Sequence, residues 1–337
     1  MILPAIPLFN EKSAENARIR QQRLAKPIGS LGMLEALSIQ LAGLTGNEHP
    51  RFHQKEVIIM AADHGVAQEG VSAYPSDVTA KMVKNFLTGG AAVTVLARQA
   101  NASVTVVDIG VNDDLEDVPG LLHRKIMRGT FNMLREPAMT RAQAEEAIQV
   151  GIDVVDQRVK GGMDLVATGE MGIGNTTPSS AIAAVYTKLP VERVTGRGTG
   201  LDDAGLTLKI KVICEAIALH QPNIQDPLDV LAKIGGLEIA GLTGVILGAA
   251  SHRIPVVVDG FISGAAALIA VEMLPDVKPF LIASHQSEEV GHTAILQKLG
   301  LKPLLNLELR LGEGSGAVLA FHLVEAATGI LNEMATL

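Results

Sequence analysis

The sequence contains no tryptophan and only two tyrosines, and aromatic residues make up 3% of its 337 positions. Its hydrophobic content of 47% therefore comes mainly from Ala, Val, Leu and Ile. Such aliphatic richness is typical of a parallel sheet that is buried between helices on both of its faces. A chain of this length can bury a substantial core, in one large domain or in a large domain with a small appendage.

Cysteine is nearly absent as well. Cys214 is the only one, so the chain cannot form an intramolecular disulfide. This fits a reducing compartment. Because Cys214 lies within the helical pattern of residues 206–219, we expect a small buried hydrophobic side chain there rather than a nucleophile.

Long hydrophobic runs and an excess of positive charge are also lacking. The formal net charge of -8 argues against nucleic acid or an anionic membrane as the main ligand, whereas a phosphate can still be held locally by backbone N–H groups. Gly, Asp or His interrupts the apolar stretches before they reach the length of a membrane span. The N-terminus has no basic segment followed by an apolar one. We therefore expect a cytoplasmic protein without a membrane partner.

Short apolar runs alternate with helical patterns from Glu56 onward. The runs predict strands at 57–61, 104–109, 165–168, 256–258 and 280–283. The patterns between them predict helices at 78–86, 91–100, 142–159, 179–188, 204–219, 265–273 and 289–299. This alternation predicts an α/β fold with a mostly parallel sheet and helices on both of its faces.

Further helices are predicted at both ends of the chain. Residues 14–26 are helix-prone, and Ser30 is expected to cap a second helix that ends before Gly46. A last helix is expected at 316–331. The early and late helices together predict a small helical subdomain beside the sheet.

Two of the central helices carry recognisable start signals. Thr140 and Gln143 have the spacing of a capping box. Thr177 and Pro178 predict a cap followed by a proline in the first helical position.

Glycine and polar residues follow nearly every predicted strand. Because ligands bind beyond the carboxyl ends of parallel strands, such clusters at one edge of a sheet predict a shared crevice. The clusters lie at 62–65, 108–110, 168–177, 259–260, 284–288 and 311–316.

The cluster at 168–177 is the best candidate for an anion site. Gly172 and Gly174 let the backbone approach a ligand, and Asn175 and Thr176 offer donors before the unpaired N–H groups of a helix. The pattern is similar to a dinucleotide fingerprint but lacks its closing Gly or Ala. An ordinary strand-to-helix turn is the alternative.

Arg197 and Lys209 are cations that can reach a phosphate, although a solvated surface position is common for such residues. The histidines show no metal-ligand spacing, and a second cysteine for a thiolate site is missing, so we predict no metal site.

Glu313 is the carboxylate that the sequence singles out. It stands between Gly312 and Gly314, directly before an apolar helix. A glutamate in this place can stabilise the helix N-terminus. It can equally act as a general base whose pKa is raised by apolar neighbours.

Six collinear segments together resemble the bacterial nicotinate-nucleotide–dimethylbenzimidazole phosphoribosyltransferases, also called CobT-like enzymes. They are 23–32, 62–66, 169–177, 258–262, 284–287 and 311–316. The resemblance implies a Rossmann-like large domain over residues 50–300. It also implies a small helical domain, built from residues 1–49 and 301–337, that contributes the catalytic glutamate, and a homodimer.

The resemblance further implies the reaction. Nicotinate mononucleotide would donate its phosphoribosyl group, with inversion, to the base 5,6-dimethylbenzimidazole, giving α-ribazole 5′-phosphate and nicotinate for cobalamin biosynthesis. No cofactor is implied. Glu313 would be the general base, and Glu170 would support the active site. The family frequently has Gln where this chain has Lys84, so the preferred base stays open.

The candidate substrate-binding residues combine the sequence pattern with the resemblance. They are Gly172, Gly174, Asn175, Thr176, Lys209, Asp259, Gly260 and Ser287 around phosphate and ribose, and Ser76 and Leu311 near the aromatic base.

Three other functions compete with this interpretation. A nicotinamide-dependent oxidoreductase would explain the glycine-rich turn, but the fingerprint is broken. A non-catalytic nucleotide- or azole-binding protein would need the same crevice but would tolerate loss of Glu313. The same transfer to another azole or purine acceptor is the strongest rival, because apolar pockets discriminate methyl groups weakly.

Overall fold

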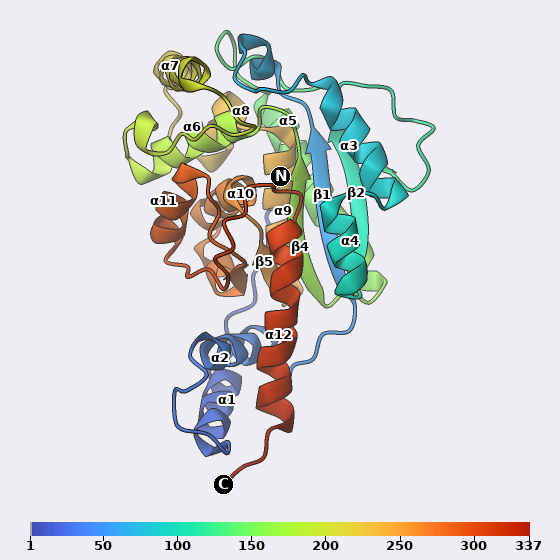
Figure 1. The fold of residues 1–337 in the computed structure, drawn as a ribbon, viewed down its shortest axis with the longest axis vertical. Helices are drawn as coiled ribbons and strands as arrows, with labels where there is room; N and C mark the ends of the chain where they lie inside the picture. The colour runs from blue at the N-terminus through green and yellow to red at the C-terminus, as the bar shows by residue number, and fades with distance from the viewer. Residues whose placement is uncertain (1) are drawn as a thin grey trace.

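The computed structural model describes residues 2–337 and contains, within them, one sheet of six parallel strands. The strands are β1 (Lys55–Ala62), β2 (Ser103–Gly110), β3 (Leu122–His123), β4 (Leu165–Met171), β5 (Val256–Val258) and β6 (Leu281–Ala283). Their order is β3-β2-β1-β4-β5-β6, so the winding reverses between β1 and β4. This is the doubly wound Rossmann arrangement, and it confirms the predicted α/β fold (Figure 1).

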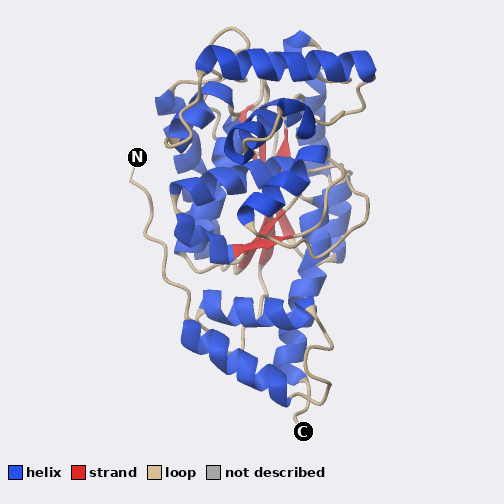
Figure 2. Cartoon of the chain, turned by 90° about the vertical axis from the view of Figure 1, so that its left-hand side faces the viewer, coloured by secondary structure: helices blue, strands red, loops and turns tan. Residues whose placement is uncertain are grey.

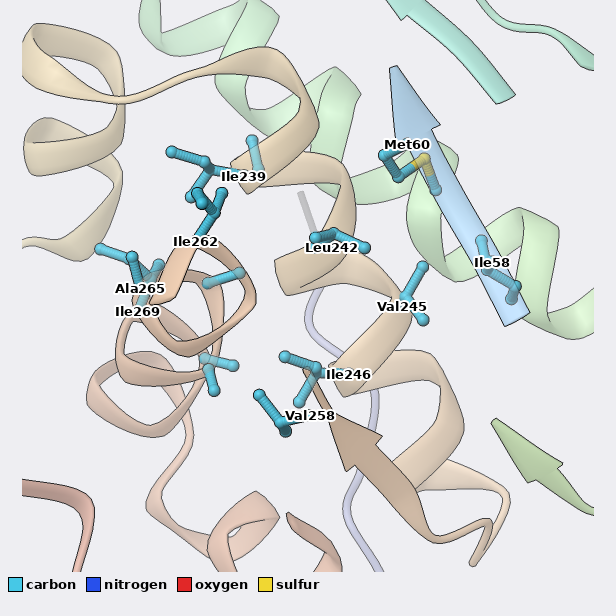
Figure 3. Close-up of a cluster of buried hydrophobic side chains, with 14 of the residues drawn as sticks. Ile58, Met60, Ile239, Leu242, Val245, Ile246, Val258, Ile262, Ala265 and Ile269 are labelled. Atoms are coloured by element: carbon cyan, nitrogen blue, oxygen red, sulfur yellow. The ribbon is translucent and has the colours of Figure 1, made fainter. Parts of the chain in front are cut away.

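One face of the sheet is covered by α9 (Leu237–Ser251), with α5 (Arg141–Lys160) and α10 (Phe261–Met273) packed against it. Figure 3 shows Leu242 and Val245 of α9 between Ile58 of β1 and Ile262 of α10. These side chains are aliphatic and buried, as the shortage of aromatic residues requires.

The other face carries α3 (Asp77–Thr88), α4 (Ala92–Gln99) and α12 (Ser315–Glu333), which lie in front of the strands in Figure 1. The remaining α-helices of the large unit are α6 (Thr176–Thr187), α7 (Asp203–His220), α8 (Pro227–Ile234) and α11 (Val290–Leu299). Short 3₁₀ helices lie at Gly65–Glu69, Val191–Arg193 and Pro275–Phe280.

A smaller helical unit extends from one end of the sheet. It consists of α1 (Glu11–Arg23), α2 (Met33–Thr45) and the C-terminal half of α12 (Figures 1 and 2). Arg20 ties the two chain ends together by donating to the carbonyl of Asn332 at 3.1 Å. The long helix α12 has the length and mean hydropathy of a membrane span, and 56% of its most apolar window is buried inside this molecule.

Two helices and one strand were absent from the sequence prediction. Helix α9 is buried around its whole circumference, so it lacks the amphipathic period by which helices are recognised. Its glycines serve close packing, since a Cβ on Gly244 would fall on the backbone carbonyl of Ile148 in α5. Helix α8 was missed although Asp226 caps it and Pro227 occupies its first position. Strand β3 has only two residues, too few to give a pattern.

Two predicted helix starts are wrong. Ser30 does not cap α2, because Gly29 and Gly32 adopt positive φ and keep the chain in turns until Met33. Helix α6 begins at Thr176, so Pro178 lies in its first turn but not in its first position. The capping box of Thr140 and the left-handed Gly46 at the end of α2 are confirmed.

The predicted burial of Cys214 is wrong as well. Its side chain is exposed on α7, because the helix turns the neighbouring Val212, Ile213 and Ala216 inward instead. Partial burial and the nearby charges of Glu192 and Glu215 raise the pKa of the thiol, which disfavours the reactive thiolate.

Candidate active site

A cavity of about 380 Å³ lies beyond the carboxyl ends of β4 and β5. Parallel strands present their loops at this edge, next to the point where the winding reverses. The cavity wall includes residues 170–173 at the end of β4 and 259–263 after β5. It also includes His285, Ser287 and Glu289 after β6 and residues 310–313 before α12. Four of the six predicted clusters therefore line this cavity, whereas the clusters at 62–65 and 108–110 do not.

The turn before α12 holds Glu313 in an unusual backbone conformation. Gly312, Glu313 and Gly314 have φ angles of 82°, 66° and 93°, all in the left-handed region. Glycine adopts this region freely, whereas a residue with a side chain does so at a cost. Gly169 of β4 makes room for this turn, since a Cβ there would lie 2.5 Å from the carbonyl oxygen of Glu313.

The buried carboxylate of Asp259 holds the turn at residues 312–314 in place through hydrogen bonds. Its Oδ2 accepts the N–H of Gly314 at 3.2 Å, and its Oδ1 accepts the N–H of Ala317 at 3.0 Å. Asp259 therefore caps the first turn of α12 from a distant part of the chain. Glu313 itself is not the N-cap, which is Gly314.

Glu170 contacts the same turn from β4. Its Oε1 accepts the backbone N–H of Glu313 at 3.4 Å, and its Oε2 accepts the side-chain amide of Asn175. Burial, together with the negative charges of Glu238 and Asp259, raises the pKa of Glu170 to about 8. At neutral pH this side chain is therefore mostly protonated.

The side chain of Glu313 is itself buried, and its Oε2 has no hydrogen-bond partner among residues 2–337. Burial raises the pKa of Glu313 to about 7; the charge of Asp259 adds to this, and the backbone N–H of Val93 opposes it. A carboxyl group with a pKa near neutrality and a free oxygen in a cavity has the properties of a general base.

Thr176 and Lys209 lie together beside the loop after β4. The Lys209 ammonium is fully buried and donates to Thr176 Oγ1 at 2.6 Å and to the carbonyl of Gly196 at 3.3 Å. The alternative of a solvated surface lysine is therefore wrong. Burial lowers the pKa of Lys209 to about 8, although the charge of Glu289 opposes this shift. Arg197 is instead held by the carbonyl of Leu201 and by Asp203.

Two histidines support the loop after β6. The Nδ1 atom of His292 accepts the backbone N–H of Ser287 at 3.0 Å, and burial lowers the pKa of His292 to about 3, so it stays neutral. His285 lines the cavity next to Gly260. Its Nδ1 atom shares a hydrogen bond with Ser284 Oγ at 2.9 Å. Through its own hydrogen bond, His292 holds Ser287 at the cavity wall.

Part of the cavity wall is apolar. It is formed by Tyr74, Val78 and Met82, which come from α3 and the loop before it, and by Leu311. Tyr74 and Leu311 are each 56% exposed, so this part is open. Apolar side chains of this kind are typical of small-molecule pockets.

The cavity brings together most of the predicted residues. Its wall contains Glu170, Gly172, Asn175, Thr176, Asp259, Gly260, Ser287, Leu311 and Glu313. Gly174, Lys209, Ser76 and Lys84 do not line it: Lys209 lies behind Thr176, and Lys84 is exposed on α3.

Sequence reasoning missed several residues of the wall, among them Met82, Glu289 and Arg310. Met82 carries no polar group, and Glu289 and Arg310 stand outside the glycine motifs. Only their nearness to the 284–288 and 311–316 clusters gave a signal.

A family model described as Phosphoribosyltransferase matches residues 6–337. Among curated relatives, the nicotinate-nucleotide–dimethylbenzimidazole phosphoribosyltransferase of Chloroflexus aggregans is 59% identical, over 97% of this chain and 93% of the relative. The enzyme of the same name from Geobacter sulfurreducens is 55% identical, over 95% of this chain and 91% of the relative.

Solved structures agree with the sequence relatives. The crystal structure of the Thermus thermophilus phosphoribosyltransferase of this name is 44% identical and superimposes with a TM-score of 0.92, covering 97% of both chains. A crystal structure of CobT from the same organism is 45% identical with a TM-score of 0.93, covering 96% of this chain and 97% of that one.

Proposed function

Because this chain belongs to the nicotinate-nucleotide–dimethylbenzimidazole phosphoribosyltransferase family, we propose that Glu313 is the general base of the transfer reaction. The enzyme moves the phosphoribosyl group of nicotinate mononucleotide onto 5,6-dimethylbenzimidazole. The free, buried Oε2 of Glu313 is the observation that carries the assignment of the base.

The chemistry requires one proton acceptor. A ring nitrogen of the neutral base attacks the anomeric carbon while the bond to nicotinate breaks, and the bonding electrons return to the pyridine nitrogen. Nicotinate thus leaves without protonation. The other nitrogen of the new benzimidazolium loses its proton to Glu313. Attack opposite the leaving group inverts the anomeric centre from β to α.

The phosphate anchors the ribotide away from the reacting carbon. We assign it to the loop after β4 and the N-terminus of α6, where Thr176 and Asn175 line the cavity. Lys209 supports this end from behind through its bond to Thr176 Oγ1. Such an anchor keeps the anomeric carbon within reach of the attacking nitrogen.

Glu170 acts by positioning in this scheme. With a pKa raised to about 8 by burial, it adds little negative charge at neutral pH. Its contact with the N–H of Glu313 and its bond to Asn175 join the base to the phosphate end. Asp259 has a similar role, because its carboxylate holds the Gly314 and Ala317 amides.

A direct assay tests the function. The purified protein is incubated with nicotinate mononucleotide and 5,6-dimethylbenzimidazole, and the products are separated by chromatography. We expect equal amounts of nicotinate and an α-configured ribotide. If other azoles or purines react much faster, the acceptor assignment fails; binding without turnover of any acceptor would favour a non-catalytic binding protein.

We also propose that the protein works in the cytoplasm as a homodimer. Large apolar side chains are exposed on the surface, among them Leu208, Leu219 and Val290, and a second copy of the chain would cover such groups. Light scattering after size-exclusion chromatography should give twice the mass of one chain. A mass equal to one chain at micromolar concentration would contradict the dimer.

A further inference from the structure

Arg310 is the one lysine or arginine, within residues 2–337, that lines the central cavity. Four carboxyl side chains line the same wall: Glu170, Asp259, Glu289 and Glu313. Within the described residues, the guanidinium of Arg310 makes no hydrogen bond and has no ion-pair partner within 4 Å. Its positive charge does act on the carboxyl group of Glu289, where it opposes the rise in pKa that burial causes. The cavity thus offers a ligand one uncommitted cation.

The backbone on both sides of Arg310 is fixed. The carbonyl of Leu309 accepts the N–H of Glu288 at 3.0 Å, and the N–H of Glu313 contacts Glu170 at 3.4 Å. The segment therefore presents the arginine at the cavity wall. Its side chain also lines a neighbouring cavity of about 430 Å³ and is exposed, which places it at the mouth.

The donor substrate carries two anionic groups, a phosphate and the ring carboxylate of nicotinate. The phosphate end of the site already has Thr176, the N-terminus of α6 and the buried ammonium of Lys209. The carboxyl side chains of the cavity wall offer this ring carboxylate no positive charge. The leaving nicotinate must also depart toward solvent, and Arg310 lies where the cavity opens.

We propose that Arg310 recognises the carboxylate of the nicotinate ring and thereby makes the enzyme prefer nicotinate mononucleotide over its amide analogue. This inference rests on the proposed function. A planar guanidinium can donate two parallel hydrogen bonds to a carboxylate, whereas a carboxamide accepts at one oxygen only and carries no charge.

Calorimetric titration tests the assignment without requiring turnover. The wild-type protein and Arg310→Met are titrated with nicotinate mononucleotide, nicotinamide mononucleotide and ribose 5-phosphate. We expect the variant to bind nicotinate mononucleotide about 10- to 100-fold more weakly and the other two ligands within about twofold of the wild type. Arg310→Lys keeps the positive charge but not the planar pair of N–H donors, so it should lose less affinity for nicotinate mononucleotide than Arg310→Met.

Two further variants calibrate the measurement. Arg193→Met removes an exposed arginine that lines neither cavity and should bind all three ligands like the wild type. Lys209→Met should weaken all three ligands, because each carries a phosphate.

The outcomes separate the two anionic groups. An equal loss of all three ligands in Arg310→Met would assign Arg310 to the phosphate and overturn the proposal. Unchanged binding of nicotinate mononucleotide would overturn it too. If the wild-type protein binds none of the ligands, the proposed function fails and this inference fails with it.

Discussion

Replacing Glu313 by glutamine is expected to lower kcat by about 10²- to 10⁴-fold, the usual contribution of a general base. Glutamine has the same shape but cannot take the proton of the attacking benzimidazole. The turn should persist in the variant, because Glu170 and Asp259 hold it through backbone N–H groups of Glu313, Gly314 and Ala317. Steady-state kinetics should therefore show a loss in kcat with nucleotide binding changed less than about threefold.

The pH dependence provides the control for this variant. Glu313 must be ionised to accept a proton, and its pKa is raised to about 7, mainly by burial. The kcat of the wild type should therefore fall as the pH decreases through about 7, and this acid limb should vanish in Glu313→Gln. A variant that keeps the acid limb, or that retains the full rate, would show that another group accepts the proton.

Much of the sheet was predictable because its strands are continuous aliphatic runs. Strand β5 has the predicted bounds, and β6 begins one residue later than predicted. β1 and β2 extend the predicted strands at both ends, and β4 extends its predicted strand by three residues at the C-terminal end. Parallel strands covered on both faces require side chains that are buried on both sides, and such runs stand out in the sequence. The position of the crevice followed from the same pattern, since each run ends in glycine and polar residues.

Helix α9 shows where such reasoning stops. A helix that is buried on all sides has no polar face, so hydrophobic periodicity cannot distinguish it from a buried strand. Its glycines at 241, 244 and 248 argue against a helix by propensity. Gly244 and Gly248 nevertheless allow close packing against α5, and Gly241 allows close packing against Ile109 and Met60 of the sheet. Tertiary packing decided the outcome here.

For the site, the sequence supplied the residues but not their roles. Capping and catalysis were equally supported for Glu313 until its positive φ and its unpartnered oxygen were known. The burial of Lys209 could not be predicted either, because burial depends on how α7 packs beside α6 and on the loop at 196–198. Each of these properties arises from segments far apart in the chain.

Asp259 is the clearest case of a role that depends on distant segments. It follows β5, whereas the two amides that it binds belong to the start of α12, more than fifty residues later. Each carboxylate oxygen of Asp259 accepts one of these backbone N–H groups, and the side chain is buried. In Asp259→Asn the amide NH₂ would replace one of the oxygens and face a backbone N–H, so that neither donor would find an acceptor. The negative charge of Asp259 also contributes to the raised pKa of Glu313.

We therefore expect Asp259→Asn to lower kcat/KM by about 100-fold and to destabilise the fold by about 1–3 kcal/mol, the cost of one unsatisfied buried polar group. Any remaining activity should have its acid limb at lower pH than the wild type, because the charge that raises the pKa of Glu313 is gone. Asp276→Asn, the same exchange at an exposed position, should change neither activity nor melting temperature. An Asp259→Asn enzyme with the kcat/KM and acid limb of the wild type would mean that Glu313 is held without this carboxylate.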